Sequence, residues 1–470
     1  MQISDSQAIM KSLKVFYKDG MKSLLERDGS AIKEVPFVKV EGKTYNISNI
    51  AGRGGAVAGN WVAAKAKAGS RGLQAEYAVE PGNIWATHTV LKNEIAAGKT
   101  HLGSYAPLLA RGFYRSTKAL RTALAASFYG RGYGEVGILL EAIASSAVDA
   151  EVDVKLTKDA IVKLDVEQDI VFKTNTTDAE SSATLAGEVI EILPGFSGVK
   201  IRVTKAGSAS AGAVVCLAGS AFAEGSPILP MGLDGWLPIV NGRTGAAWNT
   251  YIAQAFFAQH RKVASDRMAG YFYNAPASEK YTDSLINALY FARFGGMEPD
   301  IIIVNTEDRA QISKELTNLD HYYSATNSKA ARKVNIGNED FSVSAATNYV
   351  DLIVDDTFCP LGRFFIGNKS AWEYAIWFSK QDQNKDDGIS TLEPGKQEPE
   401  DLESFNFDEG VSKLNIEDYI TIQDGVDTPR GPGVTVGLGF MGALCVTDTS
   451  AWVTGVFAVA DKTKVLGWQA

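Results

Sequence analysis

The clearest pattern along the chain is a helix followed by a buried strand in its second half. From residue 281 to residue 294, apolar residues recur every three or four positions, as on one face of an α-helix: Leu285, Ile286, Leu289, Tyr290, Phe291 and Phe294. Gly295-Gly296 ends this pattern, and the chain continues after Asp300 with the apolar run Ile301 to Val304, typical of a buried strand.

A second apolar segment follows. Residues 350–354 lead through a short loop to Phe364-Phe365-Ile366-Gly367 and then to Trp372. Together the two segments predict a well-organised α/β unit. Neither segment carries a cluster of catalytic side chains, so we interpret the unit as scaffold.

Three further stretches have helical spacing. Residues 6–27 predict an amphipathic helix that is interrupted at Asp19-Gly20 and lacks a local core to cover its apolar face. Residues 103–132 predict the longest helix, with Pro107 in its first turn and a stop at Gly130-Arg-Gly132. Residues 244–268 predict another. On the long helix, basic residues indicate either a solvated face or a charged contact with a partner subunit: Arg111, Arg115, Lys118 and Arg121.

Between these helices the pattern changes twice. Residues 50–82 are rich in Gly and Ala, with Trp61 and Tyr77 as the only large anchors, and a strand pattern follows over 84–91. This order predicts an extended loop or two-stranded arm that projects from the body. Residues 152–229 then hold short β-like runs at even spacing, which predict a small all-β barrel or sandwich: 160–164, 170–172, 189–193, 199–203 and 213–217. Closing strands are expected at 411–419, 434–438 and 452–459.

Composition narrows the function classes. The chain has 470 residues, enough for two or three cores, and is 45% hydrophobic and 21% charged. No apolar run approaches the length of a membrane span, and the start lacks the pattern of a secretion signal. Three widely spaced cysteines predict reduced core thiols. A net charge of −9 argues against a surface that binds duplex DNA through basic side chains.

The sharpest local motif is an acidic segment within the polar stretch 380–410. Its oxygen-bearing side chains have the spacing of an EF-hand calcium loop: Asp382, Asn384, Asp386, Ser390 and Glu393. The match departs where the loop requires glycine, because Asp387 stands there and Gly388 comes one place late. Pro394 also prevents a clean exiting helix. A solvated acidic turn is the preferred interpretation, and calcium binding is the alternative.

Other candidates for chemistry lack partners in the sequence. Four histidines are scattered without a nucleophile or second ligand at useful spacing: His88, His101, His260 and His321. Asp355-Asp356 ends an apolar run, where paired carboxylates cap a loop more often than they hold a metal. We therefore expect no catalytic residue and no cofactor, and we expect that the protein is not an enzyme.

Taken in order, the elements resemble the major capsid proteins of tailed bacteriophages, which have the Hong Kong 97-type fold. The elements are an N-terminal arm, a Gly/Ala-rich excursion, a long helix at 103–132 and an inserted β module. The module ends in Gly232-Leu-Asp-Gly-Trp236-Leu237, and the segments 282–305 and 356–372 follow. The ending is similar to that of family members with an insertion domain.

The resemblance implies an α+β fold with five parts. These are an N-terminal arm at 1–49, an extended loop at 50–100, a peripheral domain from 101–150, 231–280 and 411–470, an inserted β-barrel-like domain at 151–230, and an axial domain at 281–410. It also implies contacts between subunits through residues of the loop and long helix: Trp61, Lys65, Lys67, Arg71, Tyr77, Arg111 and Arg115.

As function, the resemblance implies a structural protein that self-assembles as hexamers and pentamers into an icosahedral virion capsid. The shell would assemble in the bacterial host cytoplasm, without a membrane. It would enclose packaged double-stranded DNA without sequence-specific binding, and portal, scaffold or decoration proteins would be further partners.

Two other classes stay open. One is a related structural protein, either an encapsulin-like compartment shell or a phage tail or decoration protein. The other is an enzyme, with a hydrolase in the α/β half and a carbohydrate-binding module at 152–229. That hypothesis requires a nucleophile–base pair, and none is visible in the sequence.

Overall fold

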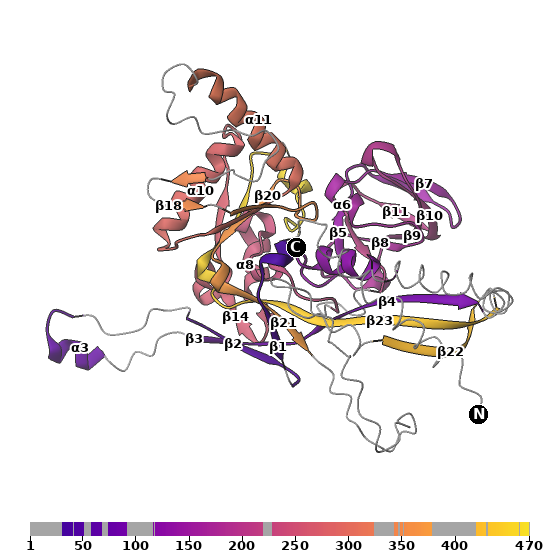
Figure 1. The fold of residues 1–470 in the computed structure, drawn as a ribbon, viewed down its shortest axis with the longest axis horizontal. Helices are drawn as coiled ribbons and strands as arrows, with labels where there is room; N and C mark the ends of the chain where they lie inside the picture. Colours follow the sequence, from indigo (N-terminus) through magenta and orange to yellow (C-terminus); the bar gives the residue numbers. More distant parts are fainter. Residues whose placement is uncertain are drawn as a thin grey trace, which may run out of the picture.

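The structure is a computed structural model. It describes residues 31–40, 42–50, 58–67, 74–91, 116, 118–219, 228–323, 343–345, 348–350, 352–377, 420–428, 431–459 and 461–469. The predictions at 6–27 and 411–419, and the acidic stretch 380–410, lie outside these residues. The architecture is α+β, as expected, and its sheets form separate groups (Figure 1).

The α/β unit predicted from the sequence is present. Strand β16 (Ile301–Val304) lies at full burial between β20 (Arg363–Gly367) and β19 (Leu352–Asp355), antiparallel to the first and parallel to the second. Helices α10 (Tyr281–Phe294) and α11 (Thr306–Tyr323) flank this sheet. Leu285, Leu289 and Ile302 share one core cluster, so the helix pattern and the strand pattern bury each other.

Two strands of the same sheet come from distant parts of the chain. The sheet order is β15-β24-β20-β16-β19, with β15 at Tyr271–Asn274 and β24 at Trp452–Val456. Both strands lie outside the 281–410 range expected for the axial domain. Conversely, β21 (Trp372–Trp377) lies inside that range but pairs in another sheet. The expected boundaries differ from the sheets because pairing between distant strands leaves no local sequence pattern.

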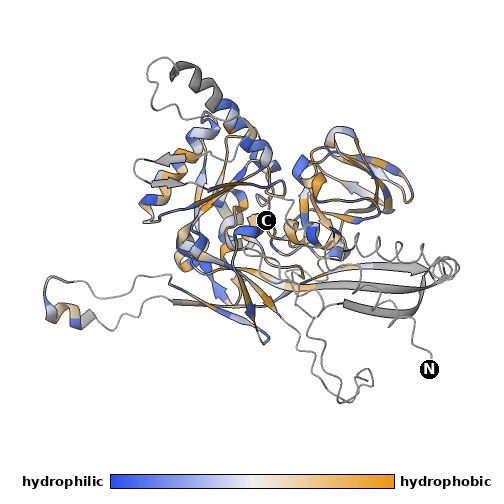
Figure 2. Cartoon of the chain, viewed as in Figure 1, coloured by the Kyte–Doolittle hydropathy of each residue, from blue (hydrophilic) through white to orange (hydrophobic). Residues whose placement is uncertain are grey.

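That other sheet has five strands. Its centre is β23 (Gly431–Val446), which pairs with β4 (Gly82–Leu91), β22 (Ile420–Thr428) and β21, and β1 (Phe37–Val40) extends it beyond β21. The predicted strand at 84–91 is therefore confirmed. Trp372 and Trp452, one from each five-stranded sheet, lie with ring centroids 4.6 Å apart, so the two sheets share a core. Figure 2 shows hydrophobic residues along the central strands.

Residues 135–217 build a third group. Six strands pair in the order β5-β12-β8-β9-β10-β7, over the ranges Glu135–Ile138, Val214–Leu217, Asp169–Lys173, Leu185–Ile192, Val199–Lys205 and Glu151–Val154. Two short strands, β6 (Ile143–Ser146) and β11 (Gly207–Ala209), pair with each other. The group encloses a core cluster of its own and forms a separate lobe (Figure 1).

One predicted strand of this lobe is wrong. Residues 160–164 do not form a strand, because α6 (Lys158–Val162) occupies this position. Ala160 and Ile161 of this helix, and Leu164 just after its end, are buried, and a short apolar run of this kind does not distinguish a helix from a strand. The helix packs directly on β5: a Cβ atom added at Gly137 would lie 2.3 Å from the Ala160 Cβ.

Two helix predictions also need correction. The stretch 244–268 contains α8 (Gly245–Ala253) and the short α9 (Ser265–Met268), with the strand pair β13 (Ala255–Phe256) and β14 (Gln259–His260) between them. Positive φ angles of 45° and 66° at Phe257 and Ala258 form the turn that interrupts the helix. Of the long helix, 118–127 is helical as predicted, and most of 103–117 lies outside the described residues.

A cluster of buried charged side chains connects segments that lie far apart in the chain. Asp234 accepts hydrogen bonds from Arg131 Nε (2.6 Å) and Arg363 Nη1 (2.7 Å), and all three side chains are almost fully buried. Both arginines also donate to backbone oxygens near the C-terminus, Arg131 to Gly467 at 2.5 Å and Arg363 to Leu466 at 3.1 Å. One carboxylate thereby orders four distant segments.

Removing this carboxylate should destabilise the chain strongly. In Asp234→Ala, two buried guanidinium groups lose their counter-charge, which costs about 3–5 kcal/mol of unfolding free energy. Glu141→Ala is the control, because it removes an exposed ion pair with Lys155 and should change the unfolding free energy by at most about 1 kcal/mol. Urea unfolding of both variants measures the difference. Equal losses in the two variants would contradict the role of Asp234.

Candidate assembly surface

The predicted projecting arm is a two-stranded hairpin. Strands β2 (Tyr45–Ile50) and β3 (Gln74–Val79) pair antiparallel, with Tyr45 opposite Val79 and Ile50 opposite Gln74. Along β3, Ala75, Tyr77 and Val79 are buried and Glu76 is exposed, so alternate side chains face the body. The hairpin therefore has one apolar face and one polar face.

Its apolar face is anchored to the body near residue 236. The ring of Tyr77 meets the rings of Trp236 and Phe256 edge-on, with centroids 5.2 and 6.0 Å away. The buried Asn49 Nδ2 donates to Thr449 Oγ1 at 2.7 Å, and Tyr45 OH donates to Glu373 at 2.6 Å. These contacts fix the direction in which the hairpin leaves the body.

Helix α3 (Trp61–Lys67) lies in the chain between the two hairpin strands and stands apart from the rest of the molecule (Figure 1). The Asn60 side chain accepts the backbone N–H of Val62 at 2.7 Å and caps the first turn. Trp61 is 78% exposed and Val62 is 72% exposed. The described part of the chain therefore leaves most of the Trp61 side chain exposed to solvent.

The residues predicted to make contacts between subunits fall into three groups. Trp61 and Lys65 are exposed on α3; Lys67 belongs to the same helix, but its side chain is not among those described. Tyr77 is fully buried in its own chain, so we leave it out of the proposed contact. The remaining candidates lie outside the described residues, as do the calcium-loop candidates: Arg71, Arg111 and Arg115, and Asp382, Asn384, Asp386, Ser390 and Glu393.

A second exposed aromatic surface lies at the end of α10. Its residues belong to the apolar pattern from which this helix was predicted. Leu285 and Leu289 are buried, but Tyr290 and Phe291 are about 40% exposed and Phe294 is 91% exposed. Phe294 comes nine residues after Leu285, and at about 3.6 residues per turn it falls on the opposite face. The angular position of each residue around the helix axis, rather than apolar spacing alone, identifies this surface.

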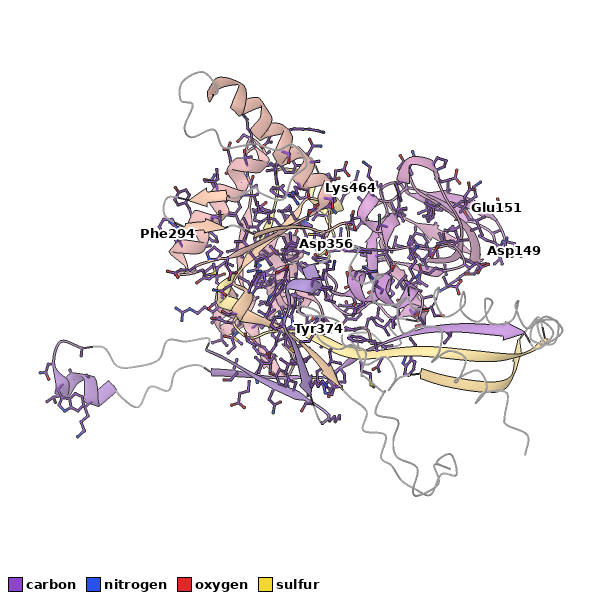
Figure 3. All side chains as sticks on the ribbon, in the orientation of Figure 1. Asp149, Glu151, Phe294, Asp356, Tyr374 and Lys464 are labelled. Carbon is purple, nitrogen blue, oxygen red and sulfur yellow. The ribbon has the colours of Figure 1, made fainter. Side chains whose placement is uncertain are left out.

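The paired carboxylates Asp355 and Asp356 are each engaged by groups of the chain itself. Asp355 pairs with Arg309 at 2.5 Å, whereas Asp356 is buried and accepts the backbone N–H groups of Ala31 and Phe358 and the Tyr129 hydroxyl at 2.8–2.9 Å (Figure 3). Burial raises the pKa of Asp356 even though these donors oppose the shift. The prediction of loop capping therefore holds for Asp356, whereas Asp355 makes an ion pair with a helix residue instead.

Asp308, in the first turn of α11, is the buried carboxyl with the clearest shift. Burial raises its pKa from 3.8 to about 7, against the hydrogen bond that it accepts from Gly362 N at 2.8 Å. Asp159 on α6 and Glu307 raise the pKa further through their charges. Asp308 accepts a backbone N–H group, and the hydroxyl that Asp356 accepts belongs to Tyr129, whose pKa burial raises well above its usual value and so disfavours the phenolate.

The described residues offer no other evident chemistry. Nowhere among them do three His, Cys, Asp or Glu side chains gather as a metal site requires. His260 is exposed beside the Ala253 carbonyl, while the side chains of His88, His101 and His321 are outside the described set. All three cysteines are buried thiols, and burial raises the pKa of Cys216 to about 12. None of the described helices is both long and apolar enough to cross a membrane.

Comparison with known proteins yields likenesses among solved structures alone. No family model and no curated protein sequence matches the chain. A subunit of the cyanophage A-1(L) capsid aligns over 92% of both chains at 12% identity, with a TM-score of 0.49. The capsid of the native GTA particle aligns over 92% of this chain and 90% of that one, at 9% identity and a TM-score of 0.39. The SrpI encapsulin of Synechococcus elongatus aligns over 93% and 86%, at 7% identity and 0.36.

The raised pKa of Asp308 predicts a pH dependence of stability. Its carboxyl is protonated more readily in the folded chain than in the unfolded chain, so the unfolding free energy should fall as pH rises from 3.8 to about 7. The expected loss between about pH 5 and pH 7 is on the order of 2 kcal/mol. Asp308→Asn stays neutral and should lack this component. Thermal unfolding of the wild type and of Asp308→Asn across this pH range tests the prediction. The same change of stability with pH in both proteins would contradict it.

Proposed function

We propose that the chain is a capsid subunit. It self-assembles as hexamers and pentamers into a closed icosahedral shell, and the shell encloses double-stranded DNA. It acts by association with copies of itself and catalyses no reaction. Its location is then the virion capsid, assembled in the host cytoplasm with portal, scaffold or decoration proteins as further partners.

The observation that carries the proposal is the exposed apolar end of the projecting arm. Trp61 and Val62 stand on a helix that leaves the body on a hairpin with an anchored base. Burying aromatic and aliphatic side chains of this size stabilises by about 1.5–3 kcal/mol each, a gain that the described part of the chain does not realise. A neighbouring copy supplies the cover, and an arm that reaches onto the next copy generates rings or closed shells.

The other observations fit a container better than an enzyme. The most shifted buried carboxylates are committed to backbone groups, as in a structural core. The net charge of −9 suits a lining that does not hold DNA tightly. The five parts expected from the sequence, including an inserted β domain at 151–230, belong to this proposal.

A compartment shell with protein cargo, like that of an encapsulin, is the alternative within the same structural class. Shells isolated from the native source and treated with nuclease from outside distinguish the two. Protected double-stranded DNA supports the capsid, whereas shells that contain protein and no nucleic acid support the compartment.

Assembly itself should depend on α3. The double substitution Trp61→Ser and Val62→Ser removes the apolar contact surface without touching the chain's own core, so we expect shells to be lost and folded small species to accumulate. Electron microscopy and sedimentation velocity measure the assembled fraction, and circular dichroism measures folding. Phe196→Ser is the matched control, because Phe196 is 52% exposed on the β lobe and should leave assembly unchanged. A wild-type chain that stays monomeric would contradict the proposed function.

A further inference from the structure

The exposed aromatic surface at the end of α10 continues onto the edge of the neighbouring sheet. Phe291 contacts Tyr271 and Tyr273 of β15, with ring centroids 6.1 Å apart in both cases. Both tyrosines are half-buried, and β15 is the terminal strand of the described sheet. We call this set the α10 aromatic surface: Tyr271, Tyr273, Tyr290, Phe291 and Phe294.

Isolated exposed apolar residues are common on protein surfaces, but here Phe291 contacts two tyrosines, and Phe294 lies one helical turn from Tyr290 and Phe291. Phe294 is the most exposed large hydrophobic side chain among the described residues, at 91%. Directly beside it, a Cβ atom added at Gly295 would lie 2.9 Å from the Tyr271 ring, so the helix end is packed closely against β15. The aromatic side chains are thus presented from a firm base, as at the centre of an association surface.

We infer that a second copy of this chain covers the α10 aromatic surface. Phe294 lies at the left edge of the molecule in Figure 3, and α3 projects from the same side in Figure 1. The view runs down the shortest axis, so this side is a true lateral face of the molecule. A neighbour that receives Trp61 and Val62 therefore approaches the face on which Phe294 stands.

This inference rests on the proposed function, because the arm fixes the side from which the neighbour arrives. The contact is heterologous. One face of each copy carries α3 and the α10 aromatic surface, and this face meets a different face of the next copy. Contacts of this kind close into rings when the rotation between copies permits. Two separated anchors on one face also define the angle between neighbours better than a flexible single anchor would.

The charges around the surface favour a protein partner over a nucleic acid. Aromatic platforms that stack bases lie in basic grooves. Here Arg293 is balanced by the exposed acids Glu298 and Asp300, which follow the helix end. A second copy of the chain is the occupant consistent with this charge balance.

Site-specific photocrosslinking of the assembled protein tests the inference. p-Benzoyl-phenylalanine replaces Phe294 in one variant, Trp61 in a second and Phe196, on the β lobe, in a third. After irradiation, covalent dimers are separated on a denaturing gel and the linked peptides are identified by mass spectrometry. We expect dimers of this chain from positions 294 and 61, and at least about tenfold fewer from position 196.

The outcomes separate the two proposals. Dimers from position 61 without dimers from position 294 overturn the inference and leave the proposed function standing. No dimers from either position overturn both. Crosslinks from position 294 to nucleic acid or to a different protein also overturn the inference.

A substitution adds a second measurement. Phe294→Ser removes no described contact within the chain, so circular dichroism and the unfolding temperature should stay as in the wild type. The assembled fraction at limiting protein concentration should fall by about tenfold or more, as for loss of an interface anchor. Phe196→Ser should leave it unchanged, and equal assembly of both variants would overturn the inference.

Discussion

The fold depends on one buried carboxylate between two arginines. Asp234 lies where the chain returns from the β lobe to the rest of the body, Arg131 where it enters that lobe, and Arg363 at the start of a central strand. Arg131 donates further hydrogen bonds to the backbone oxygens of Gly467 and Gln469, and Arg363 donates to that of Leu466. Charges at this depth are tolerated only when each is paired and hydrogen-bonded, so four chain segments must arrive together.

This internal order contrasts with the surfaces that the chain leaves uncovered. The body buries its tryptophans in shared cores, as Trp236, Trp372 and Trp452 show. Trp61 on α3 and Phe294 on α10 are instead presented to solvent from anchored elements. The described residues are therefore well packed within each lobe and leave large apolar side chains exposed at one side, which suits the proposed role as a subunit of an assembly.

The buried carboxylates fit the same division. Asp308 and Asp356 show the shifted pKa values often found at active sites, yet each accepts backbone hydrogen bonds at a junction between elements. Asp356 ties the segment that begins at Ala31 to the central sheet, and Asp308 sits near α6 of the β lobe. Both carboxyl groups hold segments of the chain in place through these hydrogen bonds.

Local patterns in the sequence determined the elements whose partners are near in the chain. The α10 helix, the β16 strand, the β4 strand and four strands of the β lobe (β8, β9, β10 and β12) follow from periodicity and turn residues, because these express which face of an element is buried. The same patterns predicted an arm around Trp61 and no catalytic cluster.

Only the tertiary structure decided which strands share a sheet, that residues 158–162 form a helix, and that Tyr77 is core while Phe294 is surface. Each of these depends on contacts between residues far apart in the chain. A short apolar run is compatible with either a helix or a strand, and an aromatic residue with either burial or exposure. Packing against distant segments makes the choice, and it leaves no local trace in the sequence.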